Sequence, residues 1–135
     1  MTEHVIVTDA DGIRTIRMNR PDKKNALTLA MYEAMTAALE GANADDSVRC
    51  VLIAGVPGAF SAGNDLADFL KAAQSTGGLS RPALHFLPAL VRCNKPMVAA
   101  VRGVAVGVGT TMLSTAILWS RARTHPFQRR SSAWA

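Results

Sequence analysis

The stretch that decides the fold is NKPMVAAVRGVAVGVGTTML, residues 94–113. The run from Met97 to Val101 is apolar and uncharged, which is typical of a strand buried in a parallel sheet. Residues 102–109 are rich in glycine and favour a turn, and a helix is predicted from about Thr110. The stretch therefore predicts a buried strand that passes through a glycine-rich turn into a helix.

The residues immediately before this stretch predict the same alternation of strand and helix. Residues 48–54 form a second apolar, β-branched run and predict another buried strand. A loop is expected over residues 55–64, and Asp65 is a good N-cap for a helix over residues 66–73. A further helix is expected over residues 81–93.

The N-terminal part predicts a hairpin and a helix. Residues 4–8 and 13–18 flank Asp11-Gly12, a dipeptide that suits a tight reversal between two strands. Thr28 is a suitable cap for a helix that runs to about Gly41, with apolar residues at three- and four-residue spacing. Strands that alternate with helices predict an α/β fold with a mainly parallel sheet.

Composition restricts the function classes. The chain has 135 residues, 49% of them hydrophobic, which is enough to form a core and too apolar for a chain disordered throughout. Four arginines after residue 120 account for +4 of the net charge of +5, so the basic character lies in the tail and does not predict nucleic-acid binding. Two cysteines and three histidines without ligand spacing predict no disulfide framework and no metal site. No signal peptide is evident, so a cytoplasmic location is expected.

Several weaker motifs fail on their spacing. In Gly107-Val108-Gly109 the third glycine of a dinucleotide fingerprint is replaced by Met112, and neither a P-loop nor a G-x-S-x-G motif is present. Residues 103–119 carry no charge and include a G-x-x-x-G pair, which leaves a small single-span membrane protein as an alternative. This run is short for a span and strand-like at its start, which favours a globular core and no membrane partner.

Two loops combine small residues with an expected strand-to-helix transition, at residues 59–65 and 103–111. Backbone N–H groups at a helix N-terminus are unpaired and attract anions or developing oxyanions. For either loop alone, ordinary turn chemistry is the favoured interpretation.

Three motifs in register resemble the crotonase family, the enoyl-CoA hydratase/isomerase superfamily. They are NRPDKKNAL at residues 19–27, AFSAGNDL at residues 59–66 and NKPMVAAVRGVAVG at residues 94–107, and the resemblance covers residues 1–113. The resemblance implies a crotonase-like ββα spiral, truncated after about the first half of the domain. It also implies binding of acyl-CoA thioesters, with coenzyme A as part of the substrate, no separate cofactor, and homotrimeric or hexameric intact relatives.

The resemblance also assigns roles to single residues. It places the two backbone N–H groups of an oxyanion hole, which stabilises an enolate, at Asn64 and Val108. It places Lys23 or Lys24 near the coenzyme A phosphates, although a solvated loop charge explains these lysines equally well. It further places Ala26, Ala62, Asp65 and Leu66 around the adenine and pantetheine, and a helix cap is the alternative role for Asp65.

The sequence departs from the family at the catalytic carboxylates. Hydratases carry a glutamate where this chain has Thr111, and isomerase-type members use a glutamate further along, beyond the resemblance. Hydratase and isomerase activity therefore both stay open. A non-catalytic acyl-CoA-binding fragment is the alternative.

Residues 114–135 form a basic tail that does not resemble the family. Permitted codons from Ser114 onward, read from the third base of each, yield HCDLVVAGPDA, the string that family members carry after this helix. The tail is therefore predicted to be out of frame and to be disordered from about Ser120.

Overall fold

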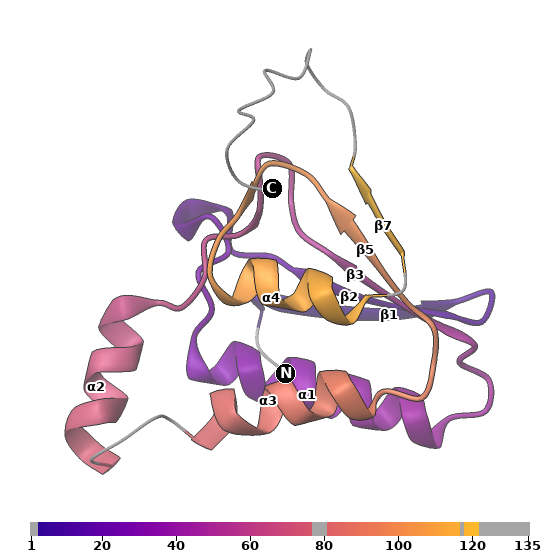
Figure 1. Ribbon diagram of the computed structural model, residues 1–135, viewed down its shortest axis with the longest axis horizontal. Helices are drawn as coiled ribbons and strands as arrows, with labels where there is room; N and C mark the ends of the chain where they lie inside the picture. The colour runs from indigo at the N-terminus through magenta and orange to yellow at the C-terminus, as the bar shows by residue number, and fades with distance from the viewer. Residues whose placement is uncertain (1–2, 77–80, 117, 122–135) are drawn as a thin grey trace.

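The computed structural model describes residues 3–76, 81–116 and 118–121. The chain starts with an antiparallel hairpin of β1 (Val5–Ala10) and β2 (Ile13–Met18), as the sequence predicted (Figure 1). Asp11 and Gly12 connect the strands with φ angles of 53° and 76°. Positive φ at both central residues characterises the tight hairpin turn that matches the twist of the strands.

The main sheet contains five strands in the order β1-β2-β3-β5-β7. Its later strands are β3 (Cys50–Ala54), β5 (Met97–Val101) and β7 (Leu118–Arg121). β2, β3, β5 and β7 pair in parallel, and only β1 is antiparallel to its neighbour. The mainly parallel sheet of an α/β fold is thus confirmed.

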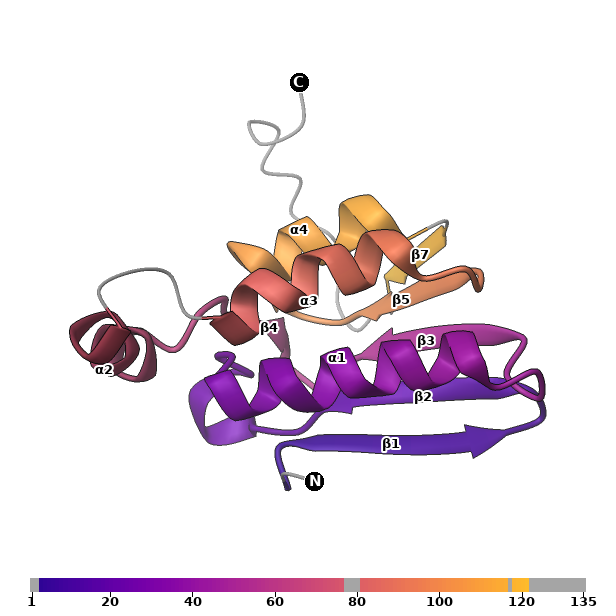
Figure 2. The same ribbon diagram turned by 90° about the horizontal axis from the view of Figure 1, so that it is seen from below.

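Two helices cover one face of this sheet. α1 (Leu29–Ala44) and α3 (Arg81–Arg92) lie side by side below the strands in Figure 1 and in front of them in Figure 2. Thr28 caps α1, because its side-chain oxygen accepts a hydrogen bond from the Met31 N–H at 3.3 Å. The core between helices and sheet contains fully buried apolar side chains from both layers, among them Ile16, Met31, Met35, Val51, Phe86 and Leu90.

A second, two-stranded sheet lies in segments for which the sequence predicts loops. β4 (Ala59–Ser61) pairs in parallel with β6 (Val104–Ala105). Strands of three and two residues are too short to show a period of two in the sequence. This small sheet joins the two glycine-containing loops, which are distant in sequence.

Two more helices follow these short strands. α2 (Leu66–Thr76) extends away from the body of the molecule (Figures 1 and 2), and α4 (Val108–Thr115) starts two residues earlier than predicted. Gly107, with a φ angle of 57°, precedes the first residue of α4. A short 3-10 helix, η1 (Pro21–Lys23), lies in the loop between the hairpin and α1.

Part of the segment expected to be a basic tail forms a strand, β7. Ser120 and Arg121 belong to β7 and pair with Ala100 and Val101, so the disorder predicted from Ser120 is wrong for these two residues. The edge of β5 offers backbone N–H and C=O groups to a further parallel strand. Such pairing does not depend on the side chains of the added strand. Residues 122–135 lie outside the described residues.

Residues 103–119 do not form one helix, because β6, α4 and the start of β7 divide them. Among the described residues, no helix has the length and the apolar content that crossing a membrane requires.

Candidate functional site

The two glycine-containing loops meet through their backbones. A Cβ atom at Gly63 would lie 3.1 Å from the Val106 carbonyl oxygen, and one at Gly107 would lie 3.8 Å from the Gly63 Cα. Both glycines have positive φ angles, 91° and 57°, which other residues rarely adopt. Because these glycines directly precede Asn64 and Val108, their contact brings the two predicted oxyanion-hole residues to one place.

The backbone N–H groups of Asn64 and Val108 are free to bind a ligand. Leu27 bridges to this segment by donating to the Gly63 carbonyl at 2.7 Å and accepting from the Asp65 N–H at 2.9 Å. In such a parallel bridge the residue between the two bonds, Asn64, directs its own N–H away from Leu27. Val108 is the first residue of α4, where N–H groups have no helical acceptor. Within residues 3–76, 81–116 and 118–121, neither N–H donates a hydrogen bond.

A buried polar network holds the first loop in position. The side-chain amide of Asn25, which has no exposed surface, donates to the carbonyl oxygens of Ala59 and Phe60 at 3.1 Å each. The Ser61 hydroxyl, also buried, donates to the Asn25 carbonyl at 2.9 Å and accepts from the Gly63 N–H at 3.1 Å. The network thus links the loop after η1 to β4 and to the glycine before Asn64.

Tyr32 of α1 reaches the same loop from the core. Its hydroxyl donates to the side-chain oxygen of Asn64, and its ring packs against Phe86 with a centroid distance of 5.2 Å. Burial raises the pKa of Tyr32 to about 12, so the hydroxyl stays protonated and remains a donor at neutral pH. The sequence assigns no individual role to Tyr32, Asn25 or Ser61, because their roles depend on contacts between distant segments.

Asp65 has a structural role in the described residues. Its carboxylate accepts from the Asp68 N–H at 3.0 Å, which caps α2 as predicted, and from the Arg20 guanidinium at 2.6 Å. The hydrogen bond from the Asp68 backbone, and then the one from Arg20, lower the pKa of Asp65 below its usual value. The carboxylate of Asp68 accepts from the Leu29 N–H at 2.7 Å. Both carboxylates near the loop are therefore engaged in holding α1 and α2.

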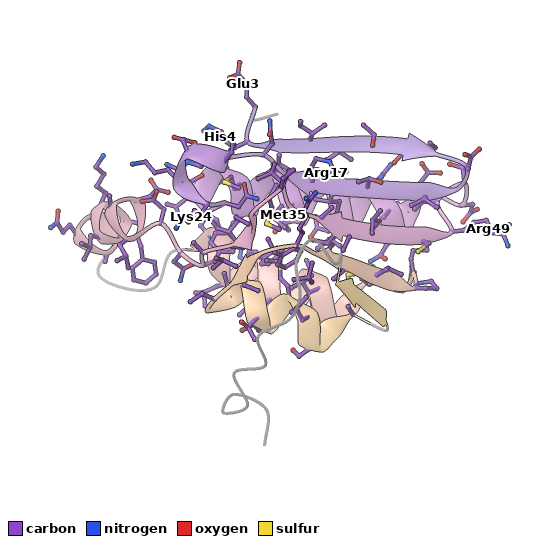
Figure 3. All side chains as sticks on the ribbon, turned by 90° about the horizontal axis from the view of Figure 1, so that it is seen from above. Glu3, His4, Arg17, Lys24, Met35 and Arg49 are labelled. Carbon is purple, nitrogen blue, oxygen red and sulfur yellow. The ribbon has the colours of Figure 1, made fainter. Side chains whose placement is uncertain are left out.

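The other predicted binding residues lie around this loop. Lys23 and Lys24 are exposed at the end of η1, and the Lys24 carbonyl accepts from the Ala62 N–H at 2.9 Å. Ala26 and Ala62 are half-buried, and Leu66 is 74% exposed at the start of α2. In Figure 3 Lys24 lies at the α2 end of the molecule, opposite Arg49. A contact between these residues and coenzyme A stays a prediction.

The position of the hydratase glutamate carries a hydroxyl. Thr111 is exposed on α4, and its side chain donates to the Gly107 carbonyl at 3.3 Å. A threonine hydroxyl is not a general base at neutral pH. In the described part of the chain, no group of three or more histidine, cysteine or acidic residues is arranged to hold a metal ion.

Comparison with known proteins agrees with this arrangement. The family model for enoyl-CoA hydratase/isomerase matches residues 8–128, beyond the end of the resemblance at Leu113. Enoyl-CoA delta isomerase 2 of Rattus norvegicus is 39% identical over 81% of this chain and 29% of its own length. Enoyl-CoA hydratase AFT3-1 of Alternaria alternata is 39% identical over 90% of this chain and 43% of its own length.

Solved structures show the same fold. Pseudomonas aeruginosa OdaA superposes with a TM-score of 0.82 and 45% identity, over 90% of this chain and 49% of that one. An enoyl-CoA hydratase/isomerase of Pseudoalteromonas atlantica T6c superposes with a TM-score of 0.81 and 36% identity, over 88% of this chain and 47% of that one. The chain spans less than half the length of these two curated relatives and about half that of the solved chains. It belongs to the enoyl-CoA hydratase/isomerase family of the crotonase superfamily.

Proposed function

We propose that this chain binds acyl-CoA thioesters with the thioester oxygen between the backbone N–H groups of Asn64 and Val108. The observation that carries the proposal is the contact between Gly63 and Gly107, which brings together two N–H groups without an acceptor in the described residues. Family membership supplies the substrate class, because the relatives' names refer to enoyl-CoA compounds.

The proposed chemistry is stabilisation of an enolate. When a proton leaves the carbon beside the thioester carbonyl, negative charge develops on the carbonyl oxygen. Two preorganised N–H donors and the positive end of the α4 dipole favour this charge, and one such donor typically contributes a factor of about 10² to 10³ in rate. The buried network of Asn25 and Ser61 fixes one of these donors before the substrate arrives.

The remaining predicted residues complete the proposed binding site. Lys23 and Lys24 are available to the coenzyme A phosphates because both side chains are exposed beside the loop. Ala26, Ala62 and Leu66 offer small or apolar surface to the adenine and pantetheine. Asp65 borders the same surface while its carboxylate stays bound to Arg20.

Replacing Val108 tests the proposed oxygen site. Proline is tolerated at the first position of a helix, so Val108→Pro removes the N–H donor, whereas Val108→Ala removes only side-chain atoms. We expect Val108→Pro to weaken crotonyl-CoA binding by about tenfold, and Val108→Ala to bind within about twofold of the original chain. Equal binding by the proline variant, in a chain shown to be folded by circular dichroism, would contradict the proposal.

Thr111 favours a second candidate function, binding of acyl-CoA without turnover. An oxyanion hole without a base polarises the substrate and does not move the proton. We therefore expect little or no hydration of crotonyl-CoA by the 135-residue chain. In a protein whose frame is restored after Leu113, Thr111→Glu should gain hydration, with Thr111→Gln as the control. Robust hydration by the unmodified chain would contradict this expectation.

A further inference from the structure

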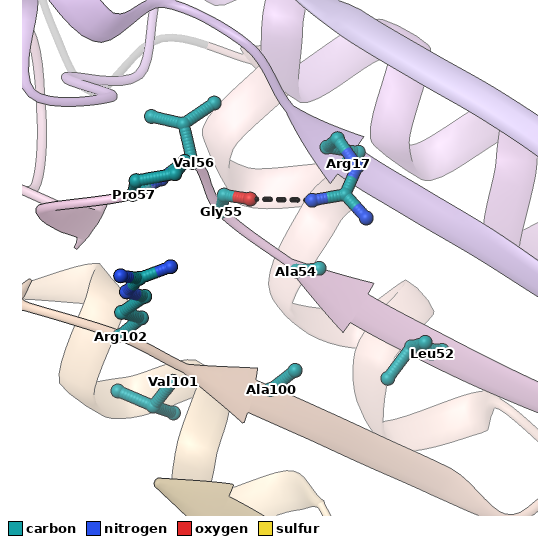
Figure 4. A pocket seen from close by; sticks show the side chains of 9 residues that line it. All are labelled: Arg17, Leu52, Ala54, Gly55, Val56, Pro57, Ala100, Val101 and Arg102. Atoms are coloured by element: carbon teal, nitrogen blue, oxygen red, sulfur yellow. Dashed lines mark hydrogen bonds between the residues drawn. The ribbon is translucent and has the colours of Figure 1, made fainter. Parts of the chain in front are cut away.

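A pocket of about 290 Å³ lies at the carboxyl ends of β2, β3 and β5. It shares no lining residue with the proposed acyl-CoA site. Its surface is formed by apolar residues and by two arginines, namely Arg17, Leu52, Ala54, Gly55, Val56, Pro57, Ala100, Val101 and Arg102 (Figure 4). Ligands of open α/β sheets bind outside the carboxyl ends of parallel strands, which is where this pocket lies.

The charges of the pocket are all positive. Arg17 donates to the Gly55 carbonyl at 2.8 Å, a neutral acceptor that orients the guanidinium beside the pocket. Figure 4 shows the Arg102 side chain extending from the end of β5 toward Val56 and Pro57. The lining contains no acidic residue. Over residues 3–76, 81–116 and 118–121, neither arginine forms an ion pair.

The floor of the pocket is apolar. Ala54 and Val101 are buried, and Leu52 and Ala100 are half-buried on neighbouring strands. Low-dielectric walls strengthen the attraction between a cation and an anion above them. The lining offers these two guanidinium groups no acidic counter-charge, and a bound anion supplies one.

We propose that this pocket binds a small dianion, held through its oxygen atoms by Arg17 and Arg102, with a short carbon chain over Leu52 and Ala100. Guanidinium groups match the geometry of carboxylate and phosphate oxygens. The volume, about 290 Å³, is at the lower limit of typical ligand pockets and suits a molecule of a few carbon atoms. Dicarboxylates and phosphate share this chemistry, and the test separates them.

Isothermal titration calorimetry of the full chain with succinate, inorganic phosphate and the neutral analogue succinamide tests the proposal. We expect saturable binding of a dianion and none of succinamide. Tighter binding of succinate assigns a dicarboxylate that uses the apolar floor, and tighter binding of phosphate assigns a phosphate group. Arg17→Gln and Arg102→Gln should each raise Kd by about tenfold. Arg49 is exposed and directly precedes β3, at the end of that strand away from the pocket. Arg49→Gln should therefore leave the Kd of the dianion within about twofold.

Three results would overturn the proposal. Absence of saturable binding contradicts the site itself. A rise of Kd in Arg49→Gln equal to that in Arg17→Gln and Arg102→Gln shows that the anion responds to net charge and not to this pocket. Competition between succinate and crotonyl-CoA places the anion in the acyl-CoA site. If Arg102→Gln does not fold, Arg102→Lys keeps the charge but loses the paired N–H donors, and it should still bind more weakly. Failure of acyl-CoA binding leaves these outcomes unchanged, because the two sites share no residue.

Discussion

At the scale of single residues, Asn25 shows how a buried polar side chain fixes the candidate site. Its amide bonds two carbonyls of β4, and its oxygen accepts from the Arg20 N–H at 2.6 Å. Asn25→Ala removes one hydrogen bond from each of these three backbone groups, and the Ala59 carbonyl keeps only the one from the Val56 N–H at 3.2 Å. We therefore expect the free energy of unfolding to fall by about 3 kcal/mol, measured by urea denaturation. Lys23→Ala, on the exposed surface beside it, should change it by less than about 0.5 kcal/mol. A loss below about 1 kcal/mol in Asn25→Ala would contradict the role of the network.

Sequence reasoning reaches some of these residues and not others. Asn64 and Val108 were assigned by resemblance and by their place at strand-to-helix transitions, both of which are local signals. Asn25 looked like one polar residue of a loop, because its partners in β4 are more than thirty positions away. The sequence assigns no role to Tyr32, since its contact with Asn64 is equally non-local. Pairings between distant segments carry no periodicity that a single sequence reveals.

At the scale of elements, the cap of α2 depends on the charge of Asp65. Asp65→Ala removes the cap and the ion pair with Arg20, so we expect the free energy of unfolding to fall by about 1–2 kcal/mol at neutral pH. The folded-state pKa of Asp65 is lowered, so its stabilisation is present above the usual value of 3.8 and is lost as pH falls through the lower folded value.

The difference between the original chain and Asp65→Ala should therefore shrink as the pH falls below about 3.8. Urea denaturation at pH 7 and in steps down to the acid limit of folding measures it. Asp46→Ala, at an exposed carboxylate after α1, serves as the control and should change the free energy of unfolding by less than about 0.5 kcal/mol. A difference that stays constant with pH would show that Asp65 acts without its charge.

The packing of α4 on β4 depends on Gly109. A Cβ atom there would lie 2.9 Å from the Ser61 carbonyl oxygen, a backbone atom that cannot rotate away. Gly109→Ala should therefore lower the free energy of unfolding by about 1–3 kcal/mol in urea denaturation. Gly41→Ala in α1 meets one atom, Nη1 of Arg14 at 3.0 Å, and the Arg14 guanidinium is held by the Ala38 carbonyl and by Asp9. A gain in helix propensity of up to about 1 kcal/mol offsets this contact, so its destabilisation should be smaller than that of Gly109→Ala. Equal destabilisation by both variants would contradict the close contact at Gly109.

The long elements were predictable, and the short ones were not. β1, β2, β3 and β5 follow apolar runs, α1 and α2 follow their predicted caps Thr28 and Asp65, and α3 matches the helix expected over residues 81–93. β4 and β6, with three and two residues, are too short to show the alternation of a strand, and they form because their backbones pair with each other. β7 falls in a segment without periodicity, where the open edge of β5 determines the pairing.

At the scale of the whole molecule, residues 114–135 are predicted to be translated out of the reading frame that the family uses. An out-of-frame tail is expected to be cut rapidly by trypsin at Arg123, Arg129 and Arg130, which lie outside the described residues. Arg121 belongs to β7 and should be cut more slowly. Limited digestion followed by mass spectrometry measures the order of cleavage. Protection of all four sites would contradict the hypothesis, and sequencing of the gene through codon 114 tests it independently.

An NMR titration of the ¹⁵N-labelled chain shows most directly whether two backbone N–H groups hold a thioester oxygen. Crotonyl-CoA carries the carbonyl, and the corresponding crotyl thioether of coenzyme A lacks it but keeps every other group. We predict that the amide protons of Asn64 and Val108 move downfield with crotonyl-CoA and do not do so with the thioether. Equal shifts with both compounds, or shifts confined to other amides, would contradict binding of the thioester oxygen by these two N–H groups.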